Sequence, residues 1–245
     1  LSLHIRRIKM ALGTLYMVPV TLGDDNLSNV IPADVMKIVQ TLEHFVVENE
    51  KSARRFLGSV KTNKPVRELS FQLLNEHTAE KDLPALITPL LAGHNVGMLS
   101  EAGCPGIADP GASLAALAHR KGIKVAPLVG PSSILLSLMA SGLNGQQFTF
   151  LGYLPSDKAA RVNRLKELEK QSQRLNETQI FIETPYRNQH MLDDILASCA
   201  GNTKLCIARN VSLESEFVVS KTIAEWKKSG LPDLHKQPTV FLLLA

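Results

Sequence analysis

Residues 100–111 read SEAGCPGIADPG, and this glycine- and proline-rich stretch decides how the chain is expected to fold. A short apolar run, residues 95–99, precedes it, and a helical pattern, residues 112–120, follows it. In an open α/β sheet, the turn between a strand and the next helix is where a ligand usually binds. Connections of this type usually have about 2 to 6 residues, so this length favours a binding loop over an ordinary connection.

The residues inside this stretch allow a bound molecule to come close to the backbone, and they also suit the start of a helix. Gly103, Gly106 and Gly111 carry no Cβ that would keep a bound molecule away from the backbone. Asp109 and Pro110 predict the N-cap and the first residue of the following helix, a more ordinary role for Asp109 than catalysis.

Strand-like and helix-like segments alternate through the first half of the chain. Such alternation predicts a mainly parallel sheet with right-handed crossovers. Gly122 fits the left-handed residue that ends a helix. Strands are expected at residues 14–20, 44–47, 66–71, 96–99 and 124–128, and helices at residues 31–41, 49–57, 82–91 and 112–120.

The second half is less regular and favours a mixed sheet. One expected strand, residues 217–220, lies so close behind Val211 that antiparallel pairing is plausible. The predicted organisation is an N-terminal extension (1–12), an N-terminal α/β domain (13–129) and a C-terminal α/β domain (130–245). In the last of these, strands are expected at 148–151, 179–182, 205–211, 217–220 and 239–244, and helices at 134–141, 157–173 and 189–199.

Composition and charge exclude several classes of protein. A hydrophobic content of 44% suits a buried core, and no apolar run reaches the roughly 18 residues of a membrane span. The net charge is +4, and Arg6, Arg7 and Lys9 carry three of these charges, so the basic pI alone is weak support for a nucleic-acid partner. Residues 1–9 lack the apolar core of a secretory signal, and Met10 is the expected natural start.

The cysteines and histidines indicate neither a disulfide framework nor a metal site. Three cysteines form no CxxC pair, which predicts a reduced, cytoplasmic protein: Cys104, Cys199 and Cys206. No HxxxH or His/Cys cluster is present, so no metal is predicted. The dinucleotide fingerprint, the phosphate loop and the hydrolase nucleophile motif are also missing.

What remains is a set of loops with small residues at the carboxyl ends of predicted strands. If the sheet order brings them together, they could line one cleft between two domains, a common place for a ligand. These loops are residues 19–23, 100–106, 130–133, 152–155 and 183–187.

The order of these loops resembles the tetrapyrrole methylase superfamily of S-adenosylmethionine-dependent methyltransferases. Within it, the chain most resembles the small-subunit ribosomal RNA (cytidine-2′-O)-methyltransferase branch, from about Gly13 to the C-terminus. SEAGCP at 100–105 is similar to the family's SDAGTP. The other matching segments are GTLY at 13–16 with Pro19 and Gly23, DPG at 109–111, GPS at 130–132, SGL at 141–143, Phe148 with GYLP at 152–155, FIETPYR at 181–187 and AR at 208–209.

The resemblance implies a two-domain α/β fold, with S-adenosylmethionine folded into the interdomain cleft, in a protein that forms homodimers. Binding of the methionine end and sulfonium would fall to the first set of residues: Pro19, Ser100, Glu101, Ala102, Gly103, Cys104, Gly106, Pro131, Ser132 and Ser133. The ribose or adenine side would fall to the second set: Leu151, Gly152, Tyr153, Leu154, Glu183 and Thr184. Backbone carbonyls can stabilise a sulfonium without a metal, and in-line methyl transfer gains most from alignment of donor and acceptor.

The chain departs from the family where a ribosomal RNA acceptor would be held. ENEK at 48–51 replaces EDTR, LNE at 74–76 replaces HNE, and RNVSL at 209–213 replaces RELTK. A 2′-hydroxyl nucleophile must lose its proton, so Glu48, Glu76 or His77 could act as the base. Each has an alternative role: a negative charge at the start of a helix explains Glu48 equally well, and a solvated loop explains the other two.

Basic residues follow the 152–155 loop and could contact RNA phosphates. Lys158, Arg161 and Arg164 belong to this predicted helix, although a solvated face with local ion pairs explains them equally well. Arg187 ends a loop that is expected to face the cleft, and Tyr186 beside it could stack on a base or pack between domains.

Three functions therefore stand open. The first is O-methylation of structured RNA, at a ribose 2′-hydroxyl of ribosomal RNA. The second is methylation of a tetrapyrrole or another small acceptor. The third is a catalytically inactive S-adenosylmethionine-binding RNA or protein module, motivated by the departures at Leu74, Asn210 and Leu213.

Overall fold

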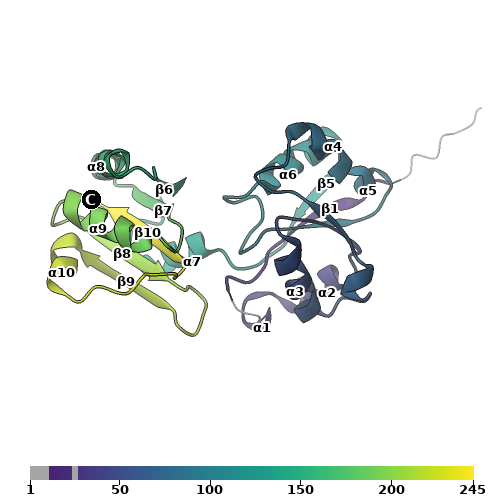
Figure 1. Ribbon diagram of the computed structural model, residues 1–245, viewed down its shortest axis with the longest axis horizontal. Coiled ribbons are helices and arrows are strands. Elements are labelled where there is room, and N and C mark those ends of the chain that lie inside the picture. The colour runs from purple at the N-terminus through teal and green to yellow at the C-terminus, as the bar shows by residue number, and fades with distance from the viewer. Residues whose placement is uncertain (1–10, 24–26) are drawn as a thin grey trace, which may run out of the picture. The chain divides into compact units, whose positions relative to one another are not determined.

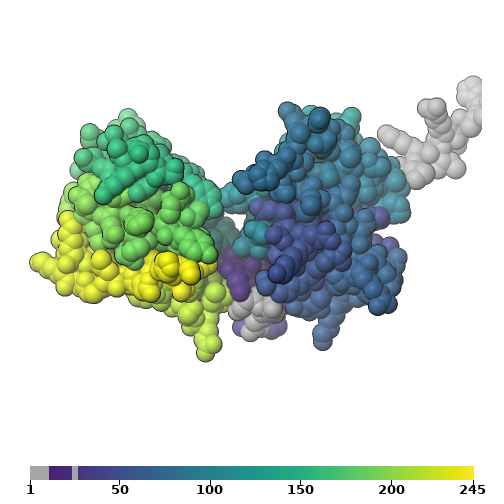
Figure 2. Space-filling model, viewed as in Figure 1, coloured from purple at the N-terminus to yellow at the C-terminus, as the bar shows by residue number. Residues whose placement is uncertain are grey.

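The computed structural model describes residues 11–23 and 27–245, and it divides the chain into two units. One unit ends at Pro131 and the other begins at Ser132. Each is built from one continuous stretch of chain, coloured purple to teal in the first unit and teal to yellow in the second (Figure 2). The sequence-based start at Met10 and most of the proposed extension lie outside the described residues.

The first unit contains a five-stranded parallel sheet, as the alternation of strands and helices predicted. Its order is β3-β2-β4-β1-β5, and every neighbouring pair runs parallel. The strands are β1 (Thr14–Val18), β2 (His44–Val47), β3 (Ser70–Leu73), β4 (Val96–Leu99) and β5 (Lys124–Pro127).

Helices cover both faces of this sheet because alternate residues of its strands point to opposite sides. On one face, Phe45 and Val47 pack with Phe56 and Leu57. On the other face, Val46 packs in a cluster with Leu114 and other helix residues. The first face is covered by α1 (Leu27–Val30), α2 (Ala33–Gln40) and α3 (Glu50–Val60), and the second by α4 (Leu83–Leu86), α5 (Thr88–Leu91) and α6 (Gly111–Arg120) (Figure 1).

Two predicted elements of this unit were wrong in their bounds. The strand expected at residues 66–71 begins only at Ser70, because Val66–Glu68 form a short 3-10 turn, η1, after Pro65. The helix expected at residues 82–91 is broken into η2 (Glu80–Asp82), α4 and α5. Each of the two α-helical pieces carries a proline in its first turn, where a missing N–H is tolerated but a continuous helix is interrupted.

The predicted start of α6 was wrong by one residue. The helix begins at Gly111 and its N-cap is Pro110, not Asp109. The Asp109 carboxylate instead accepts hydrogen bonds from two backbone N–H groups, those of Gly106 and Gly111. Asp109 therefore fastens the loop to the helix start rather than capping the helix itself. Gly122, at φ 69°, has the left-handed conformation that was predicted after this helix.

The second unit contains the mixed sheet that the sequence favoured. Its order is β6-β7-β10-β8-β9; β6 and β7 are parallel, and the other neighbours are antiparallel, including β8 and β9. The strands are β6 (Phe148–Tyr153), β7 (Thr178–Ile182), β8 (Lys204–Arg209), β9 (Phe217–Thr222) and β10 (Thr239–Leu244), and the helices are α7 (Ser133–Ser141), α8 (Lys158–Leu175), α9 (Asn188–Ser198) and α10 (Ile223–Lys228).

Two hydrophobic clusters hold this sheet between helices. Val240 and Leu242 of β10 belong to the cluster that includes Leu138 of α7. Phe241 and Leu243, the alternate residues of the same strand, belong to the cluster of α8, α9 and α10. The sequence did not predict α10, although its capping box between Thr222 and Glu225 is a recognisable start signal. Within the described ranges, no helix has the length and apolar character to cross a membrane.

Candidate active site

The first sheet changes its winding direction between β1 and β4, and this is where the candidate site lies. The chain after β1 enters the helices of one face, whereas the chain after β4 enters α6 on the other face. Open α/β sheets bind ligands at such a point, outside the carboxyl ends of the strands. The loops that leave β1, β2 and β4 meet at this edge.

The loop after β4, residues 100–110, is held in a defined shape by its own contacts. Asp109 Oδ1 accepts from the backbone N of Gly106 at 2.8 Å and of Gly111 at 2.7 Å. Gly103, Gly106 and Ala108 have positive φ angles of 69°, 85° and 60°. Glycine adopts the left-handed backbone region freely, whereas the Cβ of alanine makes it sterically unfavourable. The contacts around the loop must therefore hold Ala108 in this conformation.

The loop after β1 is attached to the same segment. The backbone N of Val20 donates to the carbonyl of Gly103 at 2.9 Å, and the Cys104 thiol donates to the carbonyl of Pro131 at 3.3 Å. Burial raises the pKa of Cys104, which keeps the thiol protonated and able to donate. A Cβ on Gly130 would lie 2.2 Å from Cγ of Pro19, so only glycine allows these two loops to approach.

Glu48 joins the end of β2 to the loop after β4. Its backbone N donates to the carbonyl of Leu99 at 3.1 Å, and its carboxylate Oε2 accepts from the backbone N of Glu101 at 3.0 Å. The next residue, Asn49, accepts hydrogen bonds from two backbone N–H groups and caps α3. Glu48 therefore helps to position the loop after β4, in addition to placing a negative charge beside it.

The electrostatic environment at this edge is acidic. Burial raises the pKa of Glu48, and the nearby charges of Asp109, Glu101 and Glu76 raise it further. Burial also raises the pKa of Asp109, against the effect of its two backbone donors. Asp109 Oδ2 is buried and has no hydrogen-bond partner among the described residues. An approaching cation would relieve the repulsion between these carboxylates.

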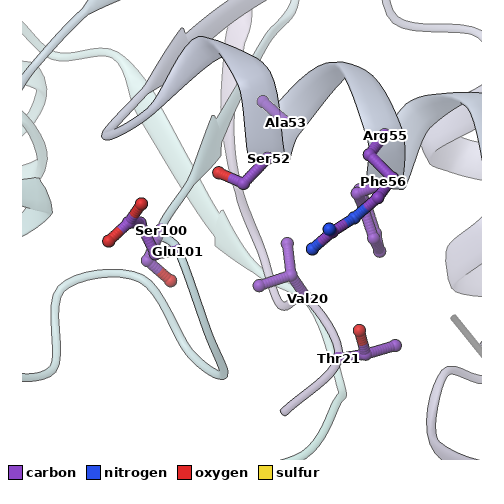
Figure 3. A pocket seen from close by; sticks show the side chains of 8 residues that line it. All are labelled: Val20, Thr21, Ser52, Ala53, Arg55, Phe56, Ser100 and Glu101. Carbon is purple, nitrogen blue, oxygen red and sulfur yellow. The ribbon is translucent and has the colours of Figure 1, made fainter. Parts of the chain in front are cut away.

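A pocket of about 310 Å³, counting the space at its mouth, opens beside this loop. Figure 3 shows how three segments line it: Ser52, Ala53, Arg55 and Phe56 come from α3, Val20 and Thr21 from the loop after β1, and Ser100 and Glu101 from the end of β4. Ser100 and Glu101 are among the residues predicted to bind the cofactor, whereas the sequence did not predict the contribution of α3. The amphipathic pattern of that helix, which buries Ala53 and Phe56, was the available signal.

The three candidate bases occupy different surroundings. Only Glu48 is hydrogen-bonded to the loop after β4. Glu76 and His77 follow β3, have side chains that are 86% and 84% exposed, and lie 3.6 Å from each other. The structure thus gives these two the character of solvated loop residues, the alternative that the sequence left open.

The predicted site residues of the second unit lie at the carboxyl ends of β6 and β7. Gly152 has a φ of 65°, and the pairing of β6 with β7 shifts register between Phe150 and Tyr153. Tyr153 is 57% exposed, whereas Leu154 is buried and Leu151 packs against the core. Ser132 begins this unit; its hydroxyl accepts from the backbone N of Leu135 and caps α7, whose first residue is Ser133.

Glu183 and Arg187 form an ion pair within the loop after β7. Glu183 Oε1 accepts from Arg187 Nη2 at 2.7 Å and from the backbone N of Thr184 at 2.6 Å. The Glu183 side chain is only 1% exposed, and its Oε2 has no partner in the described part of the chain. The carboxylate therefore holds Arg187 in place.

Arg161 does not belong to the exposed basic face that the sequence predicted for α8. Its side chain is 7% exposed and its Nη2 lies 2.7 Å from Asp194 Oδ2 of α9. Lys158 is 79% exposed and stays at the surface, with its Nζ 3.9 Å from Asp194. Arg161 is thus a structural residue between two helices, because a buried guanidinium is held by its acidic partner.

The described residues contain no group of three or more potential metal ligands. All three thiols are free: Cys104 is half-buried, and Cys199 and Cys206 are buried. The edge of the first sheet presents fixed backbone carbonyls, glycines that admit close approach, and carboxylates that attract a cation.

Comparison with known proteins defines the class. The family model of the Tetrapyrrole (Corrin/Porphyrin) Methylases matches residues 14–227, so this chain belongs to that family, and it is a methyltransferase. Its fold agrees: the methyltransferase CobJ superposes with a TM-score of 0.61 at 15% identity, covering 96% of this chain and 94% of that one. A cobalt precorrin-4 methyltransferase superposes with a TM-score of 0.60 at 12% identity, covering 94% of each chain.

Two sequence relatives bear a narrower name. Ribosomal RNA small subunit methyltransferase I of Xylella fastidiosa is 32% identical over 234 residues, which are 95% of this chain and 81% of the relative. The protein of the same name from Vibrio cholerae is 31% identical over 211 residues, which are 86% of this chain and 69% of the relative.

Proposed function

We propose that this methyltransferase uses S-adenosylmethionine to methylate small-subunit ribosomal RNA, and that the acceptor is a ribose 2′-hydroxyl. The observation that carries the proposal is the 32% identity, over 95% of this chain, to a relative named as a ribosomal RNA small subunit methyltransferase. The ribose position comes from the sequence resemblance to the 2′-O-methylating branch. Structural neighbours at 12–15% identity support the fold alone.

The chemistry of the first unit fits the cofactor. S-adenosylmethionine is a cation at its sulfur, and when bound it supplies a methyl group to a nucleophile that attacks in line. Asp109 has one buried carboxylate oxygen without a partner, and burial and neighbouring acids raise the pKa of Glu48. The Asp109 carboxylate, with the carbonyls of residues 100–106, would hold the cationic end. The assignment of ribose and adenine to Leu151–Leu154 and to Glu183 and Thr184 stays a prediction.

Glu48 is the candidate that best suits proton acceptance. A general base works best when its pKa lies near the operating pH, and burial moves the pKa of Glu48 in that direction. The exposed side chains of Glu76 and His77 lack this environment. In the proposed reaction, Glu48 would accept the hydroxyl proton as the oxygen bonds to the methyl carbon and the methyl–sulfur bond breaks, with S-adenosylhomocysteine as the leaving group. The backbone N of Glu101 keeps the Glu48 carboxylate oriented.

The experiment is methyl transfer from tritiated S-adenosylmethionine to small ribosomal subunits, and to their naked RNA, from a strain that lacks its own enzyme of this branch. Digestion to nucleosides should place the label on a 2′-O-methylated nucleoside. Label on a base would contradict the ribose position. Label on an added tetrapyrrole but not on RNA would favour the small-acceptor alternative, and cofactor binding without transfer to either would favour an inactive binding module.

We also propose that the protein is a cytoplasmic homodimer. The proposal rests on the family resemblance, and the three free thiols are consistent with a reducing compartment. Light scattering on the purified full chain measures the mass directly. A mass of one chain at micromolar concentration would contradict the dimer.

A further inference from the structure

Tyr186 is an exposed aromatic side chain on a rigid support in the second unit. It is 68% exposed, and its phenol makes no hydrogen bond to any residue in the described part of the chain. Pro185 precedes it, and α9 begins two residues later at Asn188. Its ring is therefore accessible, and the neighbouring side chains decide what it can bind.

A second loop, residues 231–238, is fastened against Tyr186. The backbone N of Lys236 donates to the carbonyl of Pro185 at 3.0 Å, and Asn188 Nδ2 donates to the carbonyl of Gln237 at 2.6 Å. Lys236 has a φ of 58°, the left-handed conformation that lysine adopts only at a cost. These two hydrogen bonds join the 231–238 loop to the segment that carries Tyr186, and they fix the position of Lys236.

These hydrogen bonds bring the side chains of Lys236 and His235 close to the Tyr186 ring. Lys236 Nζ lies 5.8 Å from the ring centroid, and the His235 ring meets it edge-on with centroids 6.3 Å apart. Both side chains are exposed. We call Tyr186, His235 and Lys236 the Tyr186 patch. No described acidic group forms a salt bridge with Lys236. Glu183 of the Tyr186 loop is paired with Arg187, and the Asp233 carboxylate accepts a hydrogen bond from the backbone N of His235 at 2.9 Å.

The chemistry of the Tyr186 patch matches an unpaired nucleotide. An exposed aromatic face stacks on a base of any identity, and a neighbouring ammonium group attracts the phosphate. An apolar protein partner would need a larger apolar surface than one ring beside a lysine. Base-paired RNA keeps its bases stacked inside the helix and offers no free face to this ring.

We infer that the Tyr186 patch binds an unpaired nucleotide of the RNA substrate, with the base stacked on Tyr186 and a phosphate beside Lys236. The inference rests on the proposed function, because it assumes that RNA is the acceptor. It adds a contact outside the glycine-rich loop of the first unit, on a loop whose Gln237 side chain accepts a hydrogen bond from Asn210 of the departing segment 209–213 at 2.6 Å.

The test measures binding of a fluorescent, unpaired 12-nucleotide RNA to the full chain by anisotropy, with the same strand in a duplex as comparison. Tyr186→Ala should weaken binding of the unpaired strand about 5- to 150-fold, the loss expected for one stacked base. Tyr186→Phe keeps the ring and should bind like the wild type. Unfolding midpoints and S-adenosylhomocysteine binding should be unchanged in both variants.

The phosphate contact has its own readout. Lys236→Gln should lower the slope of log K against log salt by about 0.7, the loss of one single-strand phosphate contact. Lys228→Gln, which removes an equally exposed lysine from α10, should leave the slope unchanged. Equal slopes for both lysine variants would overturn the phosphate contact.

The outcomes separate this inference from the proposed function. If the wild type transfers methyl groups to ribosomal RNA while Tyr186→Ala binds and reacts like the wild type, the inference fails and the function stands. If the wild type binds S-adenosylhomocysteine but neither binds nor methylates any RNA, both fail. Equal loss in the alanine and phenylalanine variants would also overturn the stacking role, since the ring is then not what binds.

Discussion

The Glu48 carboxylate accepts a hydrogen bond from the backbone N of Glu101 at 3.0 Å, which joins the end of β2 to the loop after β4. The two residues are 53 positions apart in the sequence. The bond places a partly buried carboxylate, surrounded by other acids, beside the loop proposed to bind the cationic cofactor. The protein holds these charges close together at a cost that a bound cation would offset.

The stability of the protein should show this cost as a pH dependence. Burial raises the folded-state pKa of Glu48 above its ordinary value of 4.5. The folded state then binds the proton more tightly than the unfolded state, so the stabilising effect is present at low pH and is lost as the pH rises through the folded pKa. Relative to the wild type, Glu48→Gln should therefore gain stability as the pH rises above the ordinary carboxyl pKa of 4.5 and through the raised folded-state pKa. Urea unfolding at several pH values tests this, and a difference that does not change with pH would refute it.

Asp109 should matter for both stability and cofactor binding. Asp109→Ala removes the acceptor of two backbone N–H groups in a part-buried loop, and it should cost about 1–3 kcal/mol of unfolding free energy. Asp157→Ala is the matched control, because Asp157 caps α8 through the backbone N of Ala160 and its loss should cost about 1 kcal/mol. Both variants lose stability, but only Asp109→Ala should weaken S-adenosylmethionine binding in calorimetry. Equal affinities would show that the Asp109 loop does not contact the cofactor.

Substitution of glycine by alanine should change the stability of the protein in opposite directions at two positions, Gly130 and Gly58. A Cβ on Gly130 would lie 2.2 Å from Cγ of Pro19, so Gly130→Ala should destabilise the protein by roughly 1–3 kcal/mol. Gly58 lies inside α3 with no atom within 4 Å of its missing Cβ, and Gly58→Ala should stabilise by about 0.5–1 kcal/mol. Thermal and urea unfolding measure both. A neutral Gly130→Ala would mean that the loops after β1 and β5 are not in contact.

The Arg161–Asp194 ion pair should show strong coupling. Arg161→Met or Asp194→Leu leaves one buried charge without its partner and should cost about 3–5 kcal/mol, whereas the double variant should be much less destabilised than either change alone. Lys158→Ala, which removes the exposed neighbour, should change stability by less than about 1 kcal/mol. Additive effects of the two buried substitutions in a double-mutant cycle would contradict the ion pair.

The parallel sheet and the long turn between a strand and a helix at residues 100–111 could be predicted because they depend on local signals. Strands alternate with helices, and glycine and proline mark the turns. Where local signals conflict, the prediction failed: the apolar pattern at 82–91 favoured one helix, but prolines in the first turns of α4 and α5 divide it.

Contacts between distant residues could not be predicted. Arg161 looked like part of a basic surface because its partner Asp194 lies 33 residues away on another helix. The Tyr186 patch depends likewise on the 231–238 loop, which reaches Pro185 only in the folded chain. The role of α3 beside residues 100 and 101 follows from the order of β2 and β4 in the sheet, which no local pattern specifies.

The most direct test of the central claim is calorimetric titration of the purified full chain with S-adenosylmethionine, with S-adenosylhomocysteine as the comparison ligand. Micromolar binding of about one cofactor per chain, weakened in Asp109→Ala but not in Asp157→Ala, is the predicted result. Failure of the wild type to bind either ligand would contradict the proposal that this fold still works as an S-adenosylmethionine-dependent enzyme.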